Sequence, residues 1–167
     1  MDLIKFRIPA EFVLARVTPS ASELAYGFHH GWLEPRDVVA IAVAKYDKRS
    51  PLQPAEEELA LLVQQNLWRV DELVHRLESE DQISQEPAEK LWLFLSLAYL
   101  LDNSAAFSEP LRLVEGIYAD FDYPEELQDF VRYMPLRAGD RPGPEGLLSR
   151  WRAYVERRSD HYKQRSA

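Results

Sequence analysis

Apolar residues in this chain are concentrated in one long run between Pro87 and Asn103. Residues 91–101 are apolar except for Ser96, so a helix with this sequence would be apolar on nearly every side and other elements must surround it. The run is shorter than the about 20 residues that a bilayer crossing needs. Pro87 suits a first helical position, and Asn103 suits a left-handed residue after the helix end. The sequence therefore predicts a buried central helix over residues 87–102.

Four helices are predicted before the central one, from capping signals and from apolar residues spaced three and four apart. Ser20 and Glu23 fit a capping box, and Gly31 is placed to end the first helix. Pro35 begins the second helix, for which a strand is the alternative because the segment is rich in β-branched residues. Pro54 begins the third helix, with acidic residues in the first turn, where the helix dipole favours them. The positions expected to face inward are Leu24 and Phe28; Val38, Ile41, Ala42 and Tyr46; Leu59, Leu62 and Val63; and Leu67, Val70, Leu73, Val74 and Leu77.

Three further helices are predicted after the central one. Pro110 begins the first of them. The second is capped by Asp122, has Pro124 just inside its start and ends at Pro135. Residues 137–146 are typical of a loop, and the last helix follows it and frays into a polar tail. The inward positions expected here are Leu111, Val114, Ile117 and Tyr118; Leu127, Phe130, Val131 and Met134; and Leu147, Leu148, Trp151, Tyr154 and Val155.

The N-terminal residues leave two alternatives open. Residues 3–8 alternate weakly between apolar and polar side chains, which fits a short strand, and Pro9 to Val17 fits either a helical turn or an extended arm. The length of 167 residues is that of one domain. We therefore predict an N-terminal arm over residues 1–17, a single helical domain over residues 18–163 and a disordered tail over residues 164–167.

Four prolines that begin helix pairs are almost evenly spaced. Pro19, Pro54, Pro87 and Pro124 follow one another at intervals of 35, 33 and 37 residues. Helix pairs of this length build α-solenoids, although these pairs share no repeated residues, as in an irregular bundle. The predicted fold is therefore all-α, with about eight helices in antiparallel pairs that form an irregular bundle or a short α-solenoid-like stack around the central apolar helix.

The composition is that of a soluble globular protein, with 46% hydrophobic and 29% charged residues. The chain has no cysteine, which excludes disulfides and thiolate metal sites. The first residues lack a basic region followed by an apolar one, so we expect no signal peptide, no membrane partner and a cytoplasmic location. The net charge of −8 argues against nucleic acid as a partner, because phosphate binding needs a concentrated basic face. It fits a basic protein partner or simply good solubility.

No residue pattern in the chain predicts catalysis or a bound metal. His29 and His30 are adjacent, so on a helix their side chains point about 100° apart and do not easily share one ion. His75 and His161 stand alone on polar faces. The sequence contains no glycine-rich phosphate loop and no nucleophile elbow. We therefore expect no cofactor, no metal and no enzymatic activity.

Two segments carry opposite charge. Residues 115–129 contain acidic and aromatic side chains and no Lys or Arg, whereas residues 150–165 are rich in Arg and Lys. The two segments either touch and neutralise each other, or the acidic one docks a basic partner, since aromatic residues anchor interfaces and charges steer encounter. Tyr123 is the expected aromatic anchor. The residues predicted to bind a partner are Glu115, Asp120, Asp122, Tyr123, Glu125, Glu126 and Asp129.

Several stretches resemble a family of small bacterial proteins of unassigned function. They are residues 23–27, 31–33 and Asp37, then residues 117–127 and 130–135, with Tyr-Ala-Asp-Phe-Asp-Tyr-Pro-Glu-Glu as the longest match. Members of this family recur among the immunity proteins of polymorphic-toxin and contact-dependent growth-inhibition systems. The resemblance covers most of the chain and implies a helical cytosolic protein that neutralises a toxin delivered by a neighbouring cell. It brings no catalytic motif with it.

The resemblance and the charge pattern together predict an interaction protein. It would bind a cognate, basic toxin domain and occlude the active site of that domain. A helical-repeat adaptor that holds a protein or peptide of the host cell is the alternative, and a metal-dependent enzyme that uses His29 or the acidic segment is a third hypothesis. The neighbouring gene discriminates the first two, because an immunity protein is encoded beside its toxin. The sequence leaves the oligomeric state open.

Overall fold

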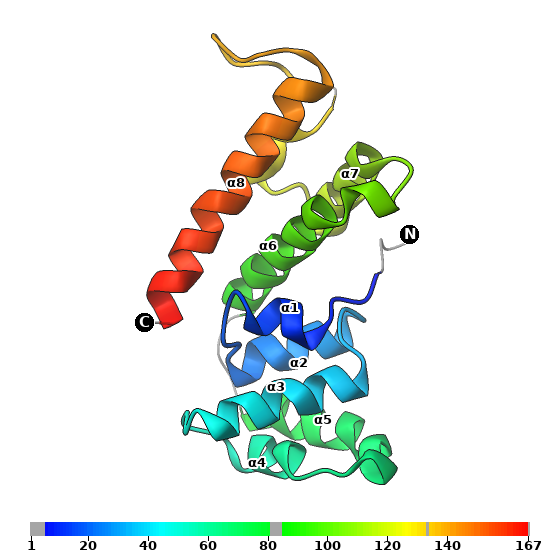
Figure 1. The fold of residues 1–167 in the computed structure, drawn as a ribbon, viewed down its shortest axis with the longest axis vertical. Helices are drawn as coiled ribbons and strands as arrows, with labels where there is room; N and C mark the ends of the chain where they lie inside the picture. The colour runs from blue at the N-terminus through cyan, green and yellow to red at the C-terminus, as the bar shows by residue number, and fades with distance from the viewer. Residues whose placement is uncertain (1–5, 81–84, 133, 167) are drawn as a thin grey trace. The chain divides into compact units, whose positions relative to one another are not determined.

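The computed structural model describes residues 6–80, 85–132 and 134–166. Over these residues the backbone forms α-helices and short 3₁₀ helices and no strand, so the predicted all-α fold of about eight helices is confirmed (Figure 1). The α-helices are α1 (Ala10–Leu14), α2 (Ala21–His29), α3 (Pro35–Asp47), α4 (Pro54–Ala60), α5 (Val70–Glu80), α6 (Glu86–Asp102), α7 (Pro110–Asp120) and α8 (Gly143–Ser166). The 3₁₀ helices are η1 (Gln64–Arg69), η2 (Ser104–Ala106) and η3 (Glu125–Phe130).

The chain forms two compact units, which divide between Trp92 and Leu93 within the sequence of α6. We call residues 5–92 the N-terminal unit and residues 93–165 the C-terminal unit. Residues 164–166 complete α8, where a disordered tail was predicted. The boundaries predicted for the N-terminal arm, the single helical domain and the tail stay a prediction, and residues 1–5 and 167 lie outside the described residues.

The first turn and the last turn of α2 are formed as the sequence predicts. The Ser20 hydroxyl accepts a hydrogen bond from the N–H of Glu23, and the Glu23 carboxylate accepts one from the N–H of Ser20 at 2.8 Å. Gly31 adopts a φ of +82° just beyond the helix. The N–H of Trp32 then reaches the carbonyl of Gly27 at 2.9 Å, which is the hydrogen bond that closes a Schellman motif.

Helices α3 to α5 form in the segments that the sequence predicts, but Leu67 lies in η1 before α5 begins, and the inward stripe of α4 is shorter than predicted. The strand alternative for the second segment is wrong, because Glu34 and Asp37 form a capping box that begins α3 at Pro35. Helix α4 ends at Ala60, so the chain leaves the helical register before residue 63. Val63, which was predicted to face inward, is therefore exposed. Tyr46, in the last turn of α3, was also predicted to face inward and is exposed as well. The N-terminal unit is built by packing α3 against α1 and α4, and α5 against α2 and α4.

Helix α6 is the buried element that the apolar run predicts. Residues 91–98 and Leu100 are all buried. The residue after the helix is different from its prediction, because Asn103 has a φ of −112° and no left-handed cap forms. The chain instead continues into η2, and the Asn103 side-chain amide donates to the carbonyl of Tyr99 at 2.9 Å.

The C-terminal unit contains one full helix fewer than predicted. Between Asp122 and Arg132 the chain forms only η3, and Val131 already has extended backbone angles, so the predicted seventh α-helix is wrong. Helix α8 begins at Gly143, inside the predicted loop. Its first turn packs against that loop, because a Cβ on Gly146 would overlap the carbonyl oxygen of Arg141. Glycine is therefore required at position 146.

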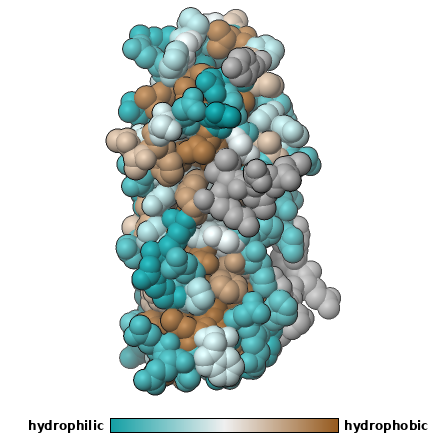
Figure 2. Space-filling model, turned by 90° about the vertical axis from the view of Figure 1, so that its right-hand side faces the viewer, coloured by the Kyte–Doolittle hydropathy of each residue, from teal (hydrophilic) through white to brown (hydrophobic). Residues whose placement is uncertain are grey.

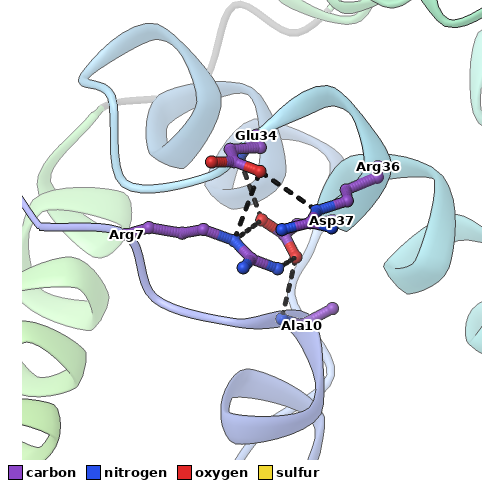
Figure 3. A network of polar contacts seen from close by, with 5 residues as sticks. All are labelled: Arg7, Ala10, Glu34, Arg36 and Asp37. Carbon is purple, nitrogen blue, oxygen red and sulfur yellow. Dashed lines mark hydrogen bonds and ion pairs between the residues drawn. The ribbon is translucent and has the colours of Figure 1, made fainter.

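The N-terminal residues are attached to α3 through a network of ionic contacts (Figure 3). Residues 6–9 form no strand, and the open choice for the following segment is resolved by α1. The Arg7 guanidinium donates to both carboxylate oxygens of the buried Asp37, at 2.8 and 2.7 Å. Burial raises the pKa of Asp37, but hydrogen bonds from Arg7 and from the N–H groups of Glu34 and Ala10 outweigh it and hold that pKa below its ordinary value.

Candidate partner-binding site

The predicted acidic segment spans the second half of α7, the tight turn after it and η3, all within the C-terminal unit. The turn follows the pattern of a Schellman motif. The N–H of Tyr123 donates to the carbonyl of Tyr118 at 2.8 Å, and the N–H of Asp122 donates to the carbonyl of Ala119 at 3.1 Å. Asp122 therefore follows the C-cap residue Phe121 of α7. Its predicted role as the cap of a following helix is wrong, since Pro124 occupies the capping position of η3.

Two consecutive residues of this turn have left-handed backbone angles although neither is glycine. The φ angles are +60° at Asp122 and +57° at Tyr123. A side chain in this region costs about 1–2 kcal/mol per residue, with less for Asp than for most others. The Tyr123 ring packs edge-on against the Tyr118 ring, with 5.2 Å between centroids, which is the apolar contact that commonly accompanies this motif. Despite this contact, 59% of Tyr123 remains exposed.

Three of the seven predicted residues are already engaged within the protein. The Glu115 carboxylate accepts two hydrogen bonds from the Arg132 guanidinium, at 2.5 and 3.2 Å. Arg137 lies 3.1 Å from a carboxylate oxygen of Asp129. Asp120 also has an interaction within the protein. These acids are less available to a partner than the sequence implies.

The other four predicted residues form an exposed group that we call the acidic tip: Asp122, Tyr123, Glu125 and Glu126. Among the residues that the structure describes, none of its three carboxylates forms an ion pair. Glu126 is close enough to the buried Tyr154 to act on it, because burial and then the charge of Glu126 raise the pKa of that phenol. The acidic tip thus combines unpaired negative charge with an exposed aromatic ring.

The basic segment, as predicted in one alternative, does contact the acidic one. Arg150 of α8 donates its Nε–H to the backbone carbonyl of Asp129 and an Nη1–H to the carbonyl of Arg141 at 2.8 Å. In both hydrogen bonds the guanidinium of Arg150 donates to a backbone carbonyl and not to a carboxylate of the acidic tip. The contact therefore positions α8 beside η3 and leaves the charge of the tip unneutralised.

The histidines are arranged differently from the sequence expectation. His29 at the end of α2 and His75 on α5 have ring centroids 5.2 Å apart, so His75 does not stand alone. His30 stacks on Tyr26 instead, with 3.9 Å between centroids. Within the described part of the chain, no three His, Asp or Glu side chains gather where they could hold a metal ion.

A second exposed surface, which the sequence analysis missed, lies in the N-terminal unit. It follows α4 and continues through η1, and we call residues 61–68 the apolar segment. Its most exposed side chains are Trp68 at 74%, Leu61 at 70% and Val63 at 55%. Figure 2 shows hydrophobic residues that reach the surface among hydrophilic ones at the lower end of the view, where α4 and α5 lie. The signal in the sequence was a stretch without charge between Glu58 and Arg69.

A comparison with known protein families finds a match over most of the chain. The profile of a family described as "Uncharacterized protein conserved in bacteria (DUF2247)" matches residues 10–159. No curated protein and no solved structure matches the chain significantly. None of the helices in the described ranges combines the length and the apolar character needed to cross a membrane.

Proposed function

We propose that this chain, which belongs to the bacterial family DUF2247, is an immunity-type interaction protein that binds a cognate basic toxin domain and blocks its active site. The observation that carries the proposal is the acidic tip. Two adjacent residues with side chains, Asp122 and Tyr123, hold left-handed backbone angles at an exposed position. Strain of this kind persists where the surrounding structure imposes it and is concentrated at functional sites.

The chemistry of the acidic tip suits a basic protein surface. Tyrosine supplies a large contact area with few rotatable bonds, so an exposed and anchored Tyr123 is pre-organised for binding. The carboxylates of Asp122, Glu125 and Glu126 add a local negative potential to a chain whose net charge is −8. Such a potential accelerates encounter with a basic partner. The protein would act in the cytoplasm by occlusion rather than by catalysis, as the resemblance to immunity proteins implies.

Charge reversal at two places on the same unit tests the proposal. The partner is the purified toxin domain encoded beside this gene, and the measurement is the association rate constant at several salt concentrations. Glu125→Lys with Glu126→Lys reverses the charge of two residues of the acidic tip. The matched control is Glu156→Lys with Asp160→Lys, which changes the net charge equally on exposed positions of α8.

The tip variant should bind at least tenfold more slowly at low salt, and the difference should shrink as salt screens the charges. The α8 variant should associate nearly as fast as the natural protein. If both variants associate equally slowly, the effect comes from net charge alone, and the acidic tip is rejected as the binding site. Absence of binding to the toxin domain by the natural protein would reject the immunity function itself.

A further inference from the structure

The apolar segment presents an exposed tryptophan beside a hollow on the same surface. The hollow has a volume of about 320 Å³ and is lined by Trp68 itself, Leu67, Pro35, Arg36 and Glu34. Tryptophan is seldom left this exposed in a monomer, whereas it is enriched among the residues that dominate binding at interfaces. The projecting indole and the hollow that could receive such a ring therefore lie on the same face.

The charges that border this surface cancel. Arg36 pairs with Glu34 at 3.0 Å next to the hollow, and Arg69 pairs with Glu58 at 3.6 Å where the apolar segment ends. The segment itself contains only apolar and amide side chains. A neutral face of this kind offers no steering to the basic partner that suits the acidic tip. It does suit a partner surface that is also neutral and apolar and whose bordering charges also form ion pairs.

We propose that the apolar segment is the contact surface of a homodimer, in which a second copy of this chain is the occupant. In a two-fold symmetric contact each residue of the patch faces the same patch, so the projecting group and the recess that takes it must both lie on one surface. Trp68 and the hollow beside it meet that requirement. Each indole enters the hollow of the other copy, between Pro35 and the guanidinium of Arg36, where a cation–π contact forms.

The paired charges at the border of this surface limit the repulsion between two copies. Two copies with a charge of −8 each repel one another, and the repulsion is weakest where the facing charges are internally paired. The inference does not rest on the proposed function, because the apolar segment belongs to the N-terminal unit and the acidic tip belongs to the C-terminal unit.

Sedimentation velocity of the full chain over a hundredfold range of concentration tests the inference. The natural protein should shift from monomer to dimer within that range. Trp68→Ser should weaken the dimer at least tenfold, as the loss of a central tryptophan does at other interfaces. Leu136→Ser is the matched control, because Leu136 is likewise an exposed apolar residue, at 52%, but lies in the C-terminal unit. This variant should leave the dimer unchanged.

Arg36→Glu provides a second variant that keeps the tryptophan. It replaces a paired border with excess negative charge on both copies, so the dimer should weaken most at low salt. Circular dichroism should show the natural helix content for all three variants. A natural protein that stays monomeric at every concentration would overturn the inference and leave Trp68 for a different kind of partner. A dimer that survives Trp68→Ser unchanged would overturn it as well, by placing the contact elsewhere.

Discussion

Gly27 of α2 lies directly against the indole of Trp92. A Cβ at position 27 would overlap Cζ2 of the ring and lie 2.5 Å from Cε2, closer than side chains pack. The indole N–H donates to the carbonyl of Glu23 at 2.7 Å, one turn earlier on the same helix. The ring therefore covers the surface of α2 at the one position where no side chain intervenes, and it is fully buried there.

Gly27→Ala should destabilise the protein by about 1–2 kcal/mol, because overpacking, which costs up to about 3 kcal/mol, outweighs the gain of about 1 kcal/mol in helix propensity. The measurement is the free energy of unfolding in urea. Trp92→Leu provides the matched background, since it removes the ring that the new methyl group meets. In that background Gly27→Ala should be neutral or stabilising. An equal loss in both backgrounds would mean that position 27 requires glycine for its backbone and not for the ring.

The Arg7–Asp37 pair predicts a specific loss of stability in acid. The pKa of Asp37 is lowered in the folded protein, so the carboxylate stabilises the fold above its unfolded pKa of about 3.9, and this stabilisation is lost as pH falls through the folded pKa. Asp37→Asn should lower the free energy of unfolding by about 2–4 kcal/mol at neutral pH, because the groups that donate hydrogen bonds to Asp37 lose a charged acceptor. The difference from the natural protein should shrink below about pH 4.

Chemical denaturation at a series of pH values checks this expectation. Asp160→Asn is a suitable control, because Asp160 is exposed on α8. A difference between Asp37→Asn and the natural protein that stays constant down to the lowest pH at which both fold would show that the charge of Asp37 is not what stabilises the network.

Lys45 of α3 and Glu56 of α4 form a buried ion pair. Removal of one partner leaves a buried charge uncompensated, so Lys45→Met should cost about 3–5 kcal/mol. Glu56→Gln should cost a similar amount, although glutamine can still accept the hydrogen bond from the N–H of Gln53 that begins α4. The double variant should recover most of that stability, because neither charge then remains in the interior.

Thermal or urea unfolding of the two single variants and the double variant forms a complete cycle. Losses that simply add in the double variant would contradict the pairing. They would show that Lys45 and Glu56 contribute through separate contacts.

Asp122 should be replaceable by glycine with a gain in stability. Gly adopts the left-handed angles without a Cβ penalty, and the substitution removes a negative charge from the C-terminal end of α7, so a gain of about 0.5–1 kcal/mol is expected. Gly31→Ala tests the converse at the equivalent position of α2, where the φ of +82° should make alanine cost about 1 kcal/mol. Both are measured by urea unfolding.

Asp122→Gly also tests the proposed function. If the acidic tip is the binding site, Asp122→Gly should raise stability and yet slow association with the basic toxin domain. Unfolding data in which Asp122→Gly loses stability would contradict the strain at this turn. Faster or unchanged association would count against Asp122 as a contact.

Much of the fold could be predicted because its signals are local. A capping box needs only Ser20 and Glu23, and a proline at the first helical position needs only its own ring, so the starts of α2, α3, α4 and α7 are predicted correctly. The burial of residues 91–98 is predictable for a similar reason. A helix that is apolar on every side has no stable place except an interior.

The predictions from the sequence were wrong where the packing of neighbouring elements decides the local structure. The pattern around Leu127 suits an α-helix, but the Schellman turn at Asp122 and Tyr123 and the early extended backbone at Val131 leave room only for η3. Val63 fits a helical stripe, but α4 ends before it and turns it to the surface. Local preference is worth a few tenths of a kcal/mol per residue, so the path that the chain must follow overrides it.

The sequence by itself determined the helical class, the buried α6 and the place of the acidic segment along the chain, because each depends on residues within a few turns of one another. Only the tertiary structure decided which of those acids remain unpaired. Arg132 reaches Glu115 from 17 residues away, and the partner of Asp129 is Arg137 beyond the end of η3. It likewise brought Gly27 under Trp92 and left Trp68 in solvent. Contacts of this kind depend on how separate elements pack, and no periodicity along the chain encodes that packing.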